Sequence, residues 1–313
     1  MPSPLAPRLE IPPGQLKTFS ELRTAGYEES DIHAALQARH IFRLRHGVYI
    51  SAPYWRMQKS WERDTWMVRA HHLTTRSALV YSHVSAARLW SFDVWNAPTE
   101  IHVVQRSRHG DNSVGVVRHN TTIPADQLVR RDGLLLTTPE RTLVDCAKLL
   151  PFELATVIAD SVLRAGALPG KIWDIIEDQT GFRNISKARQ VMSAASGLSE
   201  SPGETRLRLK VLTWGFPPPV LQYELETAHG RYRADMAWPE LKLILEFDGD
   251  TKYNLELDTD AVLLKERKRE TLLMEYGWKF VRVRWPDLSD DEALRRRLVH
   301  AYEKAFRASQ TAA

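Results

Sequence analysis

The sequence predicts an α/β protein with more than one domain. Its 313 residues exceed one ordinary domain of about 150 residues. A composition of 43% apolar and 26% charged residues is typical of a globular chain, and helical periodicities alternate with short strand-like runs. We therefore expect a small domain of helices and a hairpin at residues 1–60, an α+β region at 61–198, and an α/β sandwich with a mixed sheet at 199–313.

Composition also limits the setting and the partners of the protein. The single cysteine, Cys146, excludes an internal disulfide and a cysteine-based zinc site, and it is typical of a cytoplasmic protein. No run of about 18 apolar residues predicts a membrane span. The absence of a Gly-x-Ser-x-Gly elbow leaves Ser/His/Asp catalysis without support. No Gly-rich phosphate loop occurs either, and no organic cofactor is expected. The net charge of +4 permits a polyanionic partner such as DNA.

The first segment has the pattern of a winged helix-turn-helix. The run FSELRTAG predicts a short helix that ends at Gly26, and DIHAALQARH predicts a second helix. The run IFRLRHGVYIS then predicts a hairpin that turns at Gly47. Strict alternation would place Phe42 on the apolar face of this hairpin and Tyr49 on the opposite, basic face. In such a domain the second helix enters the major groove of DNA and the hairpin contacts the backbone.

The middle segment mixes helices with short strands and shows no catalytic constellation, so we expect it to be structural. Helices are predicted at residues 82–90, 139–150, 152–165 and 185–195, and strands at 100–104, 114–119 and 134–137. Cys146 falls within an apolar helical pattern, which favours a buried thiol over a nucleophile. His71 and His72 are adjacent and would point apart on a helix, which argues against a metal pair.

The third segment begins at a stretch rich in Ser, Pro and Gly and is expected to form an α/β sandwich with a mixed sheet. The expected order is a helix at residues 204–214, strands at 220–225, 231–237 and 241–247, a helix at 260–276, a strand at 279–285 and a helix at 290–306. Gly277 is suited to end the long polar helix.

Acidic residues stand at the ends of two of these strands. Asp235 lies at the end of one strand, and Glu246 and Asp248 close the most apolar one, where a period of two places both on one face. Carboxylates so close repel one another unless a divalent cation lies between them, and oxygen ligands suit Mg²⁺ or Mn²⁺. Lys252 is placed to balance charge on a phosphate. The competing interpretation is a solvated strand end with a common Asp-Gly turn and a solvated lysine.

These residues carry a family resemblance. The order Glu204, Asp235, Glu246-x-Asp248-Gly249 resembles the PD-(D/E)XK nucleases, and the phrases SPGETRLR, RYRADMAWPELKLILEFDG and ERKRETLLMEYGWKFVRVRW resemble the branch similar to very-short-patch-repair endonucleases. The resemblance covers about residues 199–290 and implies a restriction-endonuclease-like fold. It also implies that Asp235, Glu246 and the Phe247 carbonyl hold the metal, with Glu204 as an outer or second-metal carboxylate.

One position departs from the family pattern, since Asp248 stands where the motif has lysine. Either Lys252 takes that role, or Asp248 is a further metal ligand, or the site is inactive. The N-terminal runs resemble a second family, the type IV antitoxins of the abortive-infection E system, over most of residues 15–166. That resemblance implies binding of duplex DNA and leaves a toxin partner or self-association open.

Two hypotheses of different classes follow. The first is a Mg²⁺-dependent DNA endonuclease anchored by the winged helix, in DNA repair or in defence against foreign DNA. The alternative is a DNA-binding regulator or antitoxin whose nuclease-like domain is inactive. Both predict phosphate contacts from basic side chains, although the basic run near residue 265 also fits an exposed, salt-bridged helix face. The residues expected to contact DNA are Arg39, Arg43, Arg45, Lys265, Arg267 and Lys268.

Overall fold

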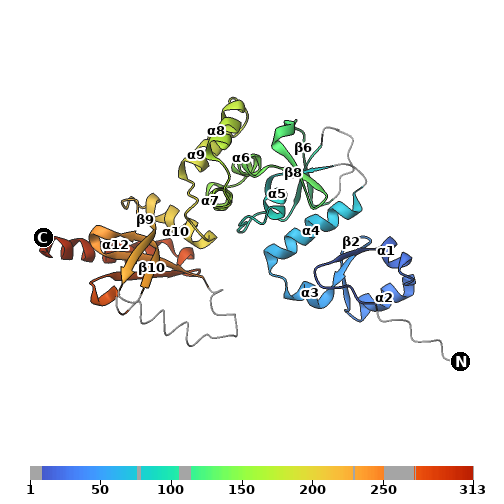
Figure 1. Ribbon diagram of the computed structural model, residues 1–313, viewed down its shortest axis with the longest axis horizontal. Helices are drawn as coiled ribbons and strands as arrows, with labels where there is room; N and C mark the ends of the chain where they lie inside the picture. Colours follow the sequence, from blue (N-terminus) through green and yellow to red (C-terminus); the bar gives the residue numbers. More distant parts are fainter. Residues whose placement is uncertain are drawn as a thin grey trace. The chain divides into compact units, whose positions relative to one another are not determined.

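The computed structural model describes residues 9–75, 79–105, 114–227, 230–249, 271 and 273–312. Its contacts divide the chain into two compact units, of which unit 1 comprises residues 1–149 and 171–178 and unit 2 comprises residues 150–170 and 179–313. The division of the chain into three separately folded domains, which the sequence predicts, stays a prediction. The α/β class is confirmed, because helices accompany three sheets in the described residues (Figure 1).

The N-terminal part of unit 1 is a three-stranded antiparallel sheet with two short helices. The elements are β1 (Leu16–Thr18), α1 (Phe19–Thr24), α2 (Glu29–Gln37), β2 (Ile41–Arg45) and β3 (Val48–Ser51), and the strand order is β1-β3-β2. The α1 helix starts at a capping box in which Thr18 and Glu21 exchange side-chain and backbone hydrogen bonds. The helix pair and the hairpin were both predicted from the sequence.

The facing of the hairpin side chains follows the predicted alternation, but their burial does not. Phe42 pairs with Ile50 and stacks on Trp55 with ring centroids 5.4 Å apart, yet it is 44% exposed. Tyr49 lies on the opposite face from Val48 and Ile50, as predicted, but it is only 6% exposed because a second apolar cluster covers that face. The hairpin therefore packs on both of its faces.

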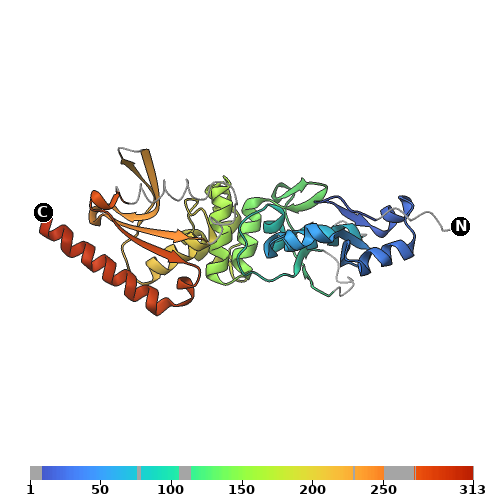
Figure 2. The same ribbon diagram turned by 90° about the horizontal axis from the view of Figure 1, so that it is seen from below.

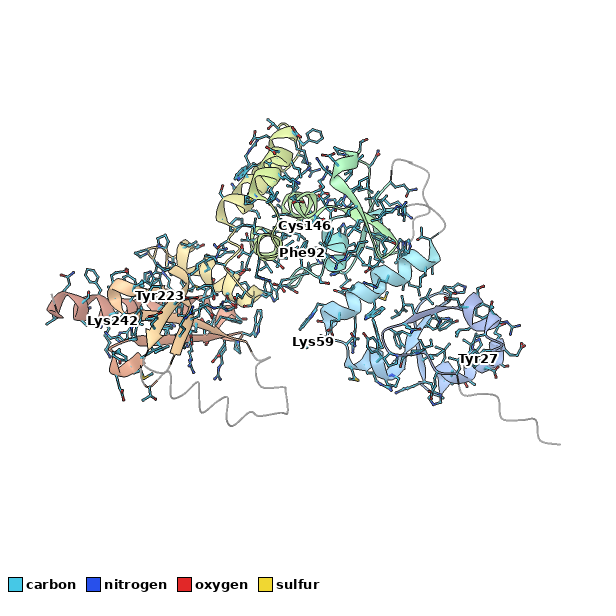
Figure 3. The ribbon with its side chains drawn as sticks, viewed as in Figure 1. Tyr27, Lys59, Phe92, Cys146, Tyr223 and Lys242 are labelled. Carbon is cyan, nitrogen blue, oxygen red and sulfur yellow. The ribbon has the colours of Figure 1, made fainter. Side chains whose placement is uncertain are left out.

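The remainder of unit 1 is a five-stranded mixed sheet with helices. The strand order is β6-β5-β4-β8-β7, and α5 packs on both β5 and α6. The elements are α3 (Ala52–Met57), α4 (Ser60–Thr74), β4 (Val80–Tyr81), α5 (His83–Leu89), β5 (Ile101–Val104), β6 (Val116–His119), η1 (Ala125–Gln127), β7 (Leu128–Arg131), β8 (Leu134–Thr137), α6 (Pro139–Leu149) and α8 (Pro169–Asp178). Cys146 on α6, labelled in Figure 3, is buried, as its apolar surroundings in the sequence predicted.

Unit 2 is built on a four-stranded mixed sheet in the order β12-β11-β10-β9, with β11 parallel to β12 and the other pairs antiparallel. Its elements are α7 (Phe152–Arg164), α9 (Ile185–Ala194), α10 (Pro202–Thr213), β9 (Val220–Thr227), β10 (Gly230–Trp238), η2 (Pro239–Leu241), β11 (Leu243–Asp248), β12 (Lys279–Arg284), η4 (Asp287–Ser289) and α12 (Asp291–Ala312). The helix expected at residues 260–276 lies mostly outside the described residues.

Each face of this sheet has its own apolar core. On one face α10 and α12 cover the sheet, and Figure 2 shows α12 running along it. This core includes Leu207 of α10, Met236 of β10, Leu245 of β11 and Leu298 of α12. The opposite face carries a smaller core with Ala234, Ile244, Phe280 and the rings of Tyr223 and Tyr232.

A buried polar hub ties α10 to α7 within unit 2. The Asp160 carboxylate on α7 accepts hydrogen bonds from Arg208 at 2.8 Å, from the Thr205 hydroxyl at 2.8 Å and from the Ser196 N–H at 2.7 Å. The Asp160 and Arg208 side chains are 1% and 6% exposed. Because both charges are paired and hydrogen-bonded, the hub fixes the position of α10 without leaving an uncompensated buried charge. No helix in the described parts of the chain has the length and apolar character required to cross a membrane.

Candidate functional site

The predicted acidic residues lie where strands β10 and β11 separate. The two strands pair from Trp238 with Leu243 to Met236 with Leu245. At the next position of β10, the Asp235 carboxylate reaches across and accepts a hydrogen bond from the Phe247 N–H at 2.8 Å. A side chain thus takes the place of a main-chain acceptor, and the carboxylate is held at the fork between the strands.

A distortion of β9 lies directly opposite Asp235. The β9–β10 pairing passes from Ala234 with Tyr223 to Met236 with Leu221, and between them Gln222 has a φ of +51°. Regular alternation would put Ala234 and Met236 on one face, yet they belong to different cores. Irregularities of this kind redirect side chains beside functional sites. Tyr223, the neighbour of Gln222 on β9, is labelled in Figure 3 and shows where this distortion lies in unit 2.

The buried carboxylate of Glu204 lies close to this fork. It is 8% exposed and accepts hydrogen bonds from the Glu200 N–H and the Ser201 hydroxyl, each at 2.8 Å, and from Gln222 Nε2 at 3.2 Å. Burial, followed by the negative charge of Asp235, raises the pKa of Glu204 to about 7, although the hydrogen bonds act in the opposite direction. The carboxylates of Glu204 and Asp235 therefore lie near each other, and near neutral pH Glu204 can both bind and release a proton.

Close contact between α10 and β11 sets the position of Glu204. Gly203 precedes it, and a Cβ built on this glycine would lie 2.0 Å from Cε1 of Phe247. Only a residue without a Cβ permits this approach. The Phe247 ring also packs edge-on against Trp285 with centroids 5.0 Å apart. The same residue whose N–H binds Asp235 thus fixes the start of the helix that carries Glu204.

Glu246 occupies the other side of the fork. It pairs in register with Arg282 on the parallel strand β12, and Arg282 Nε lies 3.5 Å from a Glu246 carboxylate oxygen. The Tyr232 hydroxyl donates a hydrogen bond to the same carboxylate. Burial, and then the charge of Glu246, raises the pKa of Tyr232 well above its ordinary value, so this hydroxyl keeps its proton.

The donors at the fork are chemically suited to a hard divalent cation. They are carboxylate oxygens, which Mg²⁺ and Mn²⁺ prefer, and a cation would relieve the repulsion between Glu204 and Asp235 that raises the pKa of Glu204. Among the described residues, the carboxylates do not gather as three ligand atoms within 4.8 Å of one another.

The remaining predicted residues are Asp248 in unit 2, three arginines in unit 1, and four residues that the structure does not describe. Asp248 ends β11, where it pairs in register with Arg284 and, two residues after Glu246, lies on the same face. In unit 1, Arg39 has a φ of +56° and is exposed, Arg43 is exposed and Arg45 is half-buried. Four predicted residues lie outside the described residues: Lys252, Lys265, Arg267 and Lys268.

Sequence reasoning did not identify three polar partners at the fork. Gln222 contacts Glu204, while Tyr232 and Arg282 hold Glu246. The motif-based reasoning did not assign them a role because they come from neighbouring strands. A correct strand order, with β12 parallel to β11, would have placed Arg282 beside Glu246. The distortion of β9 at Gln222, where φ is +51°, has no comparable signal in the sequence.

Comparison with known proteins places the chain among relatives without an assigned activity. No family model matches it. Two Mycobacterium tuberculosis proteins are similar to it: uncharacterized protein MT2308 of strain CDC 1551 and uncharacterized protein Rv2248 of strain H37Rv. Each is 31% identical over 200 residues, which cover 63% of this chain and 71% of the relative.

Proposed function

The chain belongs to the family of these two mycobacterial proteins, and we propose that unit 2 is a metal-dependent DNA endonuclease related to the PD-(D/E)XK nucleases. The observation that carries this proposal is the pair of carboxylates at the fork, where burial and then the charge of Asp235 raise the pKa of Glu204 to about 7. A strand end that serves only to meet solvent has no reason to hold two acidic groups against each other, one of them buried.

Asp235, Glu246 and the Phe247 carbonyl would hold Mg²⁺ or Mn²⁺. When bound, such an ion lowers the pKa of a water and neutralises charge on a phosphodiester. The contacts of Asp235 support this assignment, because the Phe247 N–H fixes one carboxylate oxygen of Asp235 at the fork. Tyr232 and Arg282 support it too, since they orient Glu246 from the neighbouring strands.

Glu204 would act on protons near the fork. A carboxyl group with a pKa of about 7 is divided between its acidic and basic forms at neutral pH, which suits general acid–base chemistry. Its backbone and hydroxyl donors hold the carboxylate in one orientation. Gln222 adds a third donor from the distorted strand. Glu204 is thus positioned to accept or return a proton beside the Asp235 carboxylate.

The N-terminal part of unit 1 would bind duplex DNA as a winged helix. Two helices followed by a hairpin, on a sheet of order β1-β3-β2, support this interpretation. Arg39 and Arg43 are exposed. Glu29 and Asp31 occupy the first turn of α2 and would repel phosphates, so the hairpin is the part expected to contact the backbone.

Cleavage of supercoiled plasmid tests the nuclease proposal. The wild type, Asp235→Asn and Glu246→Gln would be incubated with Mg²⁺, Mn²⁺ or a chelator, with Glu226→Gln on the exposed edge of β9 as the matched control. Asparagine retains an acceptor for the Phe247 N–H, so loss of cleavage would reflect charge. We expect nicking by the wild type and the control in metal alone, and a loss of at least about a hundredfold in both fork variants. Equal cleavage by all four proteins would contradict the assignment.

A second function is favoured by Asp248. This residue stands at the lysine position of the resembled motif, and a DNA-binding regulator with an inactive nuclease-like domain would account for that difference. The regulator predicts salt-dependent duplex binding without hydrolysis in any metal. The variant Asp248→Lys distinguishes the nuclease from the regulator. Cleavage that appears only in this variant would show that the natural site is inactive because it lacks the motif lysine. Cleavage by the wild type would show that Asp248 is compatible with activity.

A further inference from the structure

Three histidines from separate elements of unit 1 converge on one point. His83 begins α5, His102 lies in β5 and His119 ends β6. One ring nitrogen from each lies within 4.8 Å of the others, and we call these residues the histidine cluster. His119 pairs in register with Val104 on the parallel strand β5, so that His102 and His119 lie on the same sheet face. The α5 helix packs on β5, which brings His83 to the group.

The three rings are in direct contact. Nδ1 of His102 lies 2.9 Å from Nε2 of His119. The ring centroids of His83 and His119 are 3.7 Å apart with an interplanar angle of 15°, and those of His83 and His102 are 5.6 Å apart. Imidazoles at these separations present several nitrogen lone pairs to one small volume.

A neighbouring hydroxyl holds one of the rings in place. The Ser82 hydroxyl contacts Nδ1 of His83 at 2.9 Å, which leaves Nε2 as the nitrogen available for another role. The main-chain N–H of His102 donates to the Ser85 hydroxyl at 2.8 Å, which joins β5 to α5 beside the cluster. His83 also has a φ of +50°, a strained conformation for a residue with a side chain. Support on the second ring nitrogen is the usual arrangement around a metal-binding histidine.

The electrostatic setting favours neutral imidazoles. Burial lowers the pKa of His102 to about 4 and also lowers the pKa of His83 and of His119, and the neighbouring rings act in the same direction on His83 and His102. Neutral rings bind a cation without first releasing a proton. Nε2 of His102 is buried and has no hydrogen-bond partner within the described part of the molecule. A buried polar nitrogen left in this way is costly unless a ligand satisfies it.

We propose that the histidine cluster binds one transition-metal dication of the zinc class. Imidazole nitrogen suits Zn²⁺, Co²⁺, Ni²⁺ and Cu²⁺, whereas Mg²⁺ prefers oxygen. Three histidines leave a fourth tetrahedral position to water. The cluster belongs to unit 1 and the acidic fork to unit 2, so this site is independent of the proposed nuclease site.

Metal binding by the untagged full-length protein tests the proposal. Chelator-treated wild type, His119→Gln and His71→Gln would be dialysed against Zn²⁺ and analysed for bound metal by mass spectrometry, and the Co²⁺ forms by visible absorption. His119 is the least buried ligand, so its variant is the one most suited to fold. His71 is the matched control, because it is buried and contacts the Tyr81 hydroxyl at 3.0 Å but lies outside the cluster.

We expect one zinc per chain in the wild type and in the control, tetrahedral Co²⁺ bands, and an affinity weaker by at least about tenfold in His119→Gln. Zinc absent from the wild type, or held equally by His119→Gln, would overturn the site. X-ray absorption on the zinc-loaded wild type keeps the proposal falsifiable if the variant does not fold. Three imidazole scatterers support the site, and fewer than three refute it.

Discussion

Replacing Glu204 with Gln should remove a pH dependence of stability that this carboxyl imposes on unit 2. Glutamine keeps the shape of the side chain and an oxygen that accepts a hydrogen bond, but it carries no charge at any pH. In the wild type, burial and Asp235 raise the pKa of Glu204 from 4.5 to about 7. The folded protein therefore binds this proton more tightly than the unfolded chain does, and ionisation of the carboxyl destabilises the fold.

The size of the effect follows from the pKa. Each tenfold change in proton affinity is worth about 1.4 kcal/mol, so a rise from 4.5 to about 7 corresponds to about 3 kcal/mol. Stability relative to Glu204→Gln should fall as the pH rises from about 4.5 to about 7, because the unfolded chain has lost the proton while the folded protein retains it. Above about pH 7 the difference should level off, since both states are then ionised.

Pulse proteolysis in urea would measure the effect. The surviving fragment identifies unit 2, and chelator in every buffer keeps metal away from the fork. Wild type and Glu204→Gln would be compared from pH 4 to pH 9. Parallel stability curves across this range, or a wild type that gains stability relative to the variant as pH rises, would refute the electrostatic reasoning about Glu204 and Asp235.

Three further changes test the packing and the DNA-binding surface. Gly203→Ala should destabilise unit 2 by about 1–3 kcal/mol in urea unfolding, because its Cβ meets the Phe247 ring, whereas Gly170→Ala, with nothing within 4 Å, should be neutral or stabilising. Asp160→Ala should cost unit 2 about 3–5 kcal/mol by leaving Arg208 buried without its carboxylate, and a loss below 1 kcal/mol would show that the hub is dispensable. Arg43→Ala should weaken duplex binding in a fluorescence titration and reduce its salt dependence by about one phosphate contact; an unchanged salt slope would remove Arg43 from the interface.

Much of the fold was predictable because its signals are local. The helices at Pro139–Leu149 and Phe152–Arg164 were predicted to within a residue or two from periodicity, and the strand at Lys279–Arg284 similarly from its apolar alternation. In the hairpin, alternation gave the facing of the side chains but not their burial. Tyr49 is buried because a second apolar cluster covers its face, and such packing by other elements leaves no pattern in the strand itself.

The candidate site was predictable in its residue types and less so in its contacts. Asp235 and Glu246 were identified from expected places at strand ends, but Asp235 lies inside β10, and it is the antiparallel pairing with β11 that brings its carboxylate to the Phe247 N–H. The contacts of Glu246 with Tyr232 and Arg282 depend on the strand order. The histidine cluster was missed for the same reason, because His83, His102 and His119 are widely spaced in the chain and meet only through the parallel pairing of β5 with β6 and the packing of α5.

The most direct test of the nuclease proposal is the rate at which supercoiled DNA is nicked by the wild type and by Asp235→Asn, at matched DNA occupancy and over a titration of Mn²⁺. The proposal predicts that the wild-type rate rises with Mn²⁺ and falls to background in chelator, while the variant binds DNA at least as well and does not cleave it. Nicking that is equal in the two proteins, or a wild type that binds DNA and leaves it intact at every Mn²⁺ concentration, would contradict it.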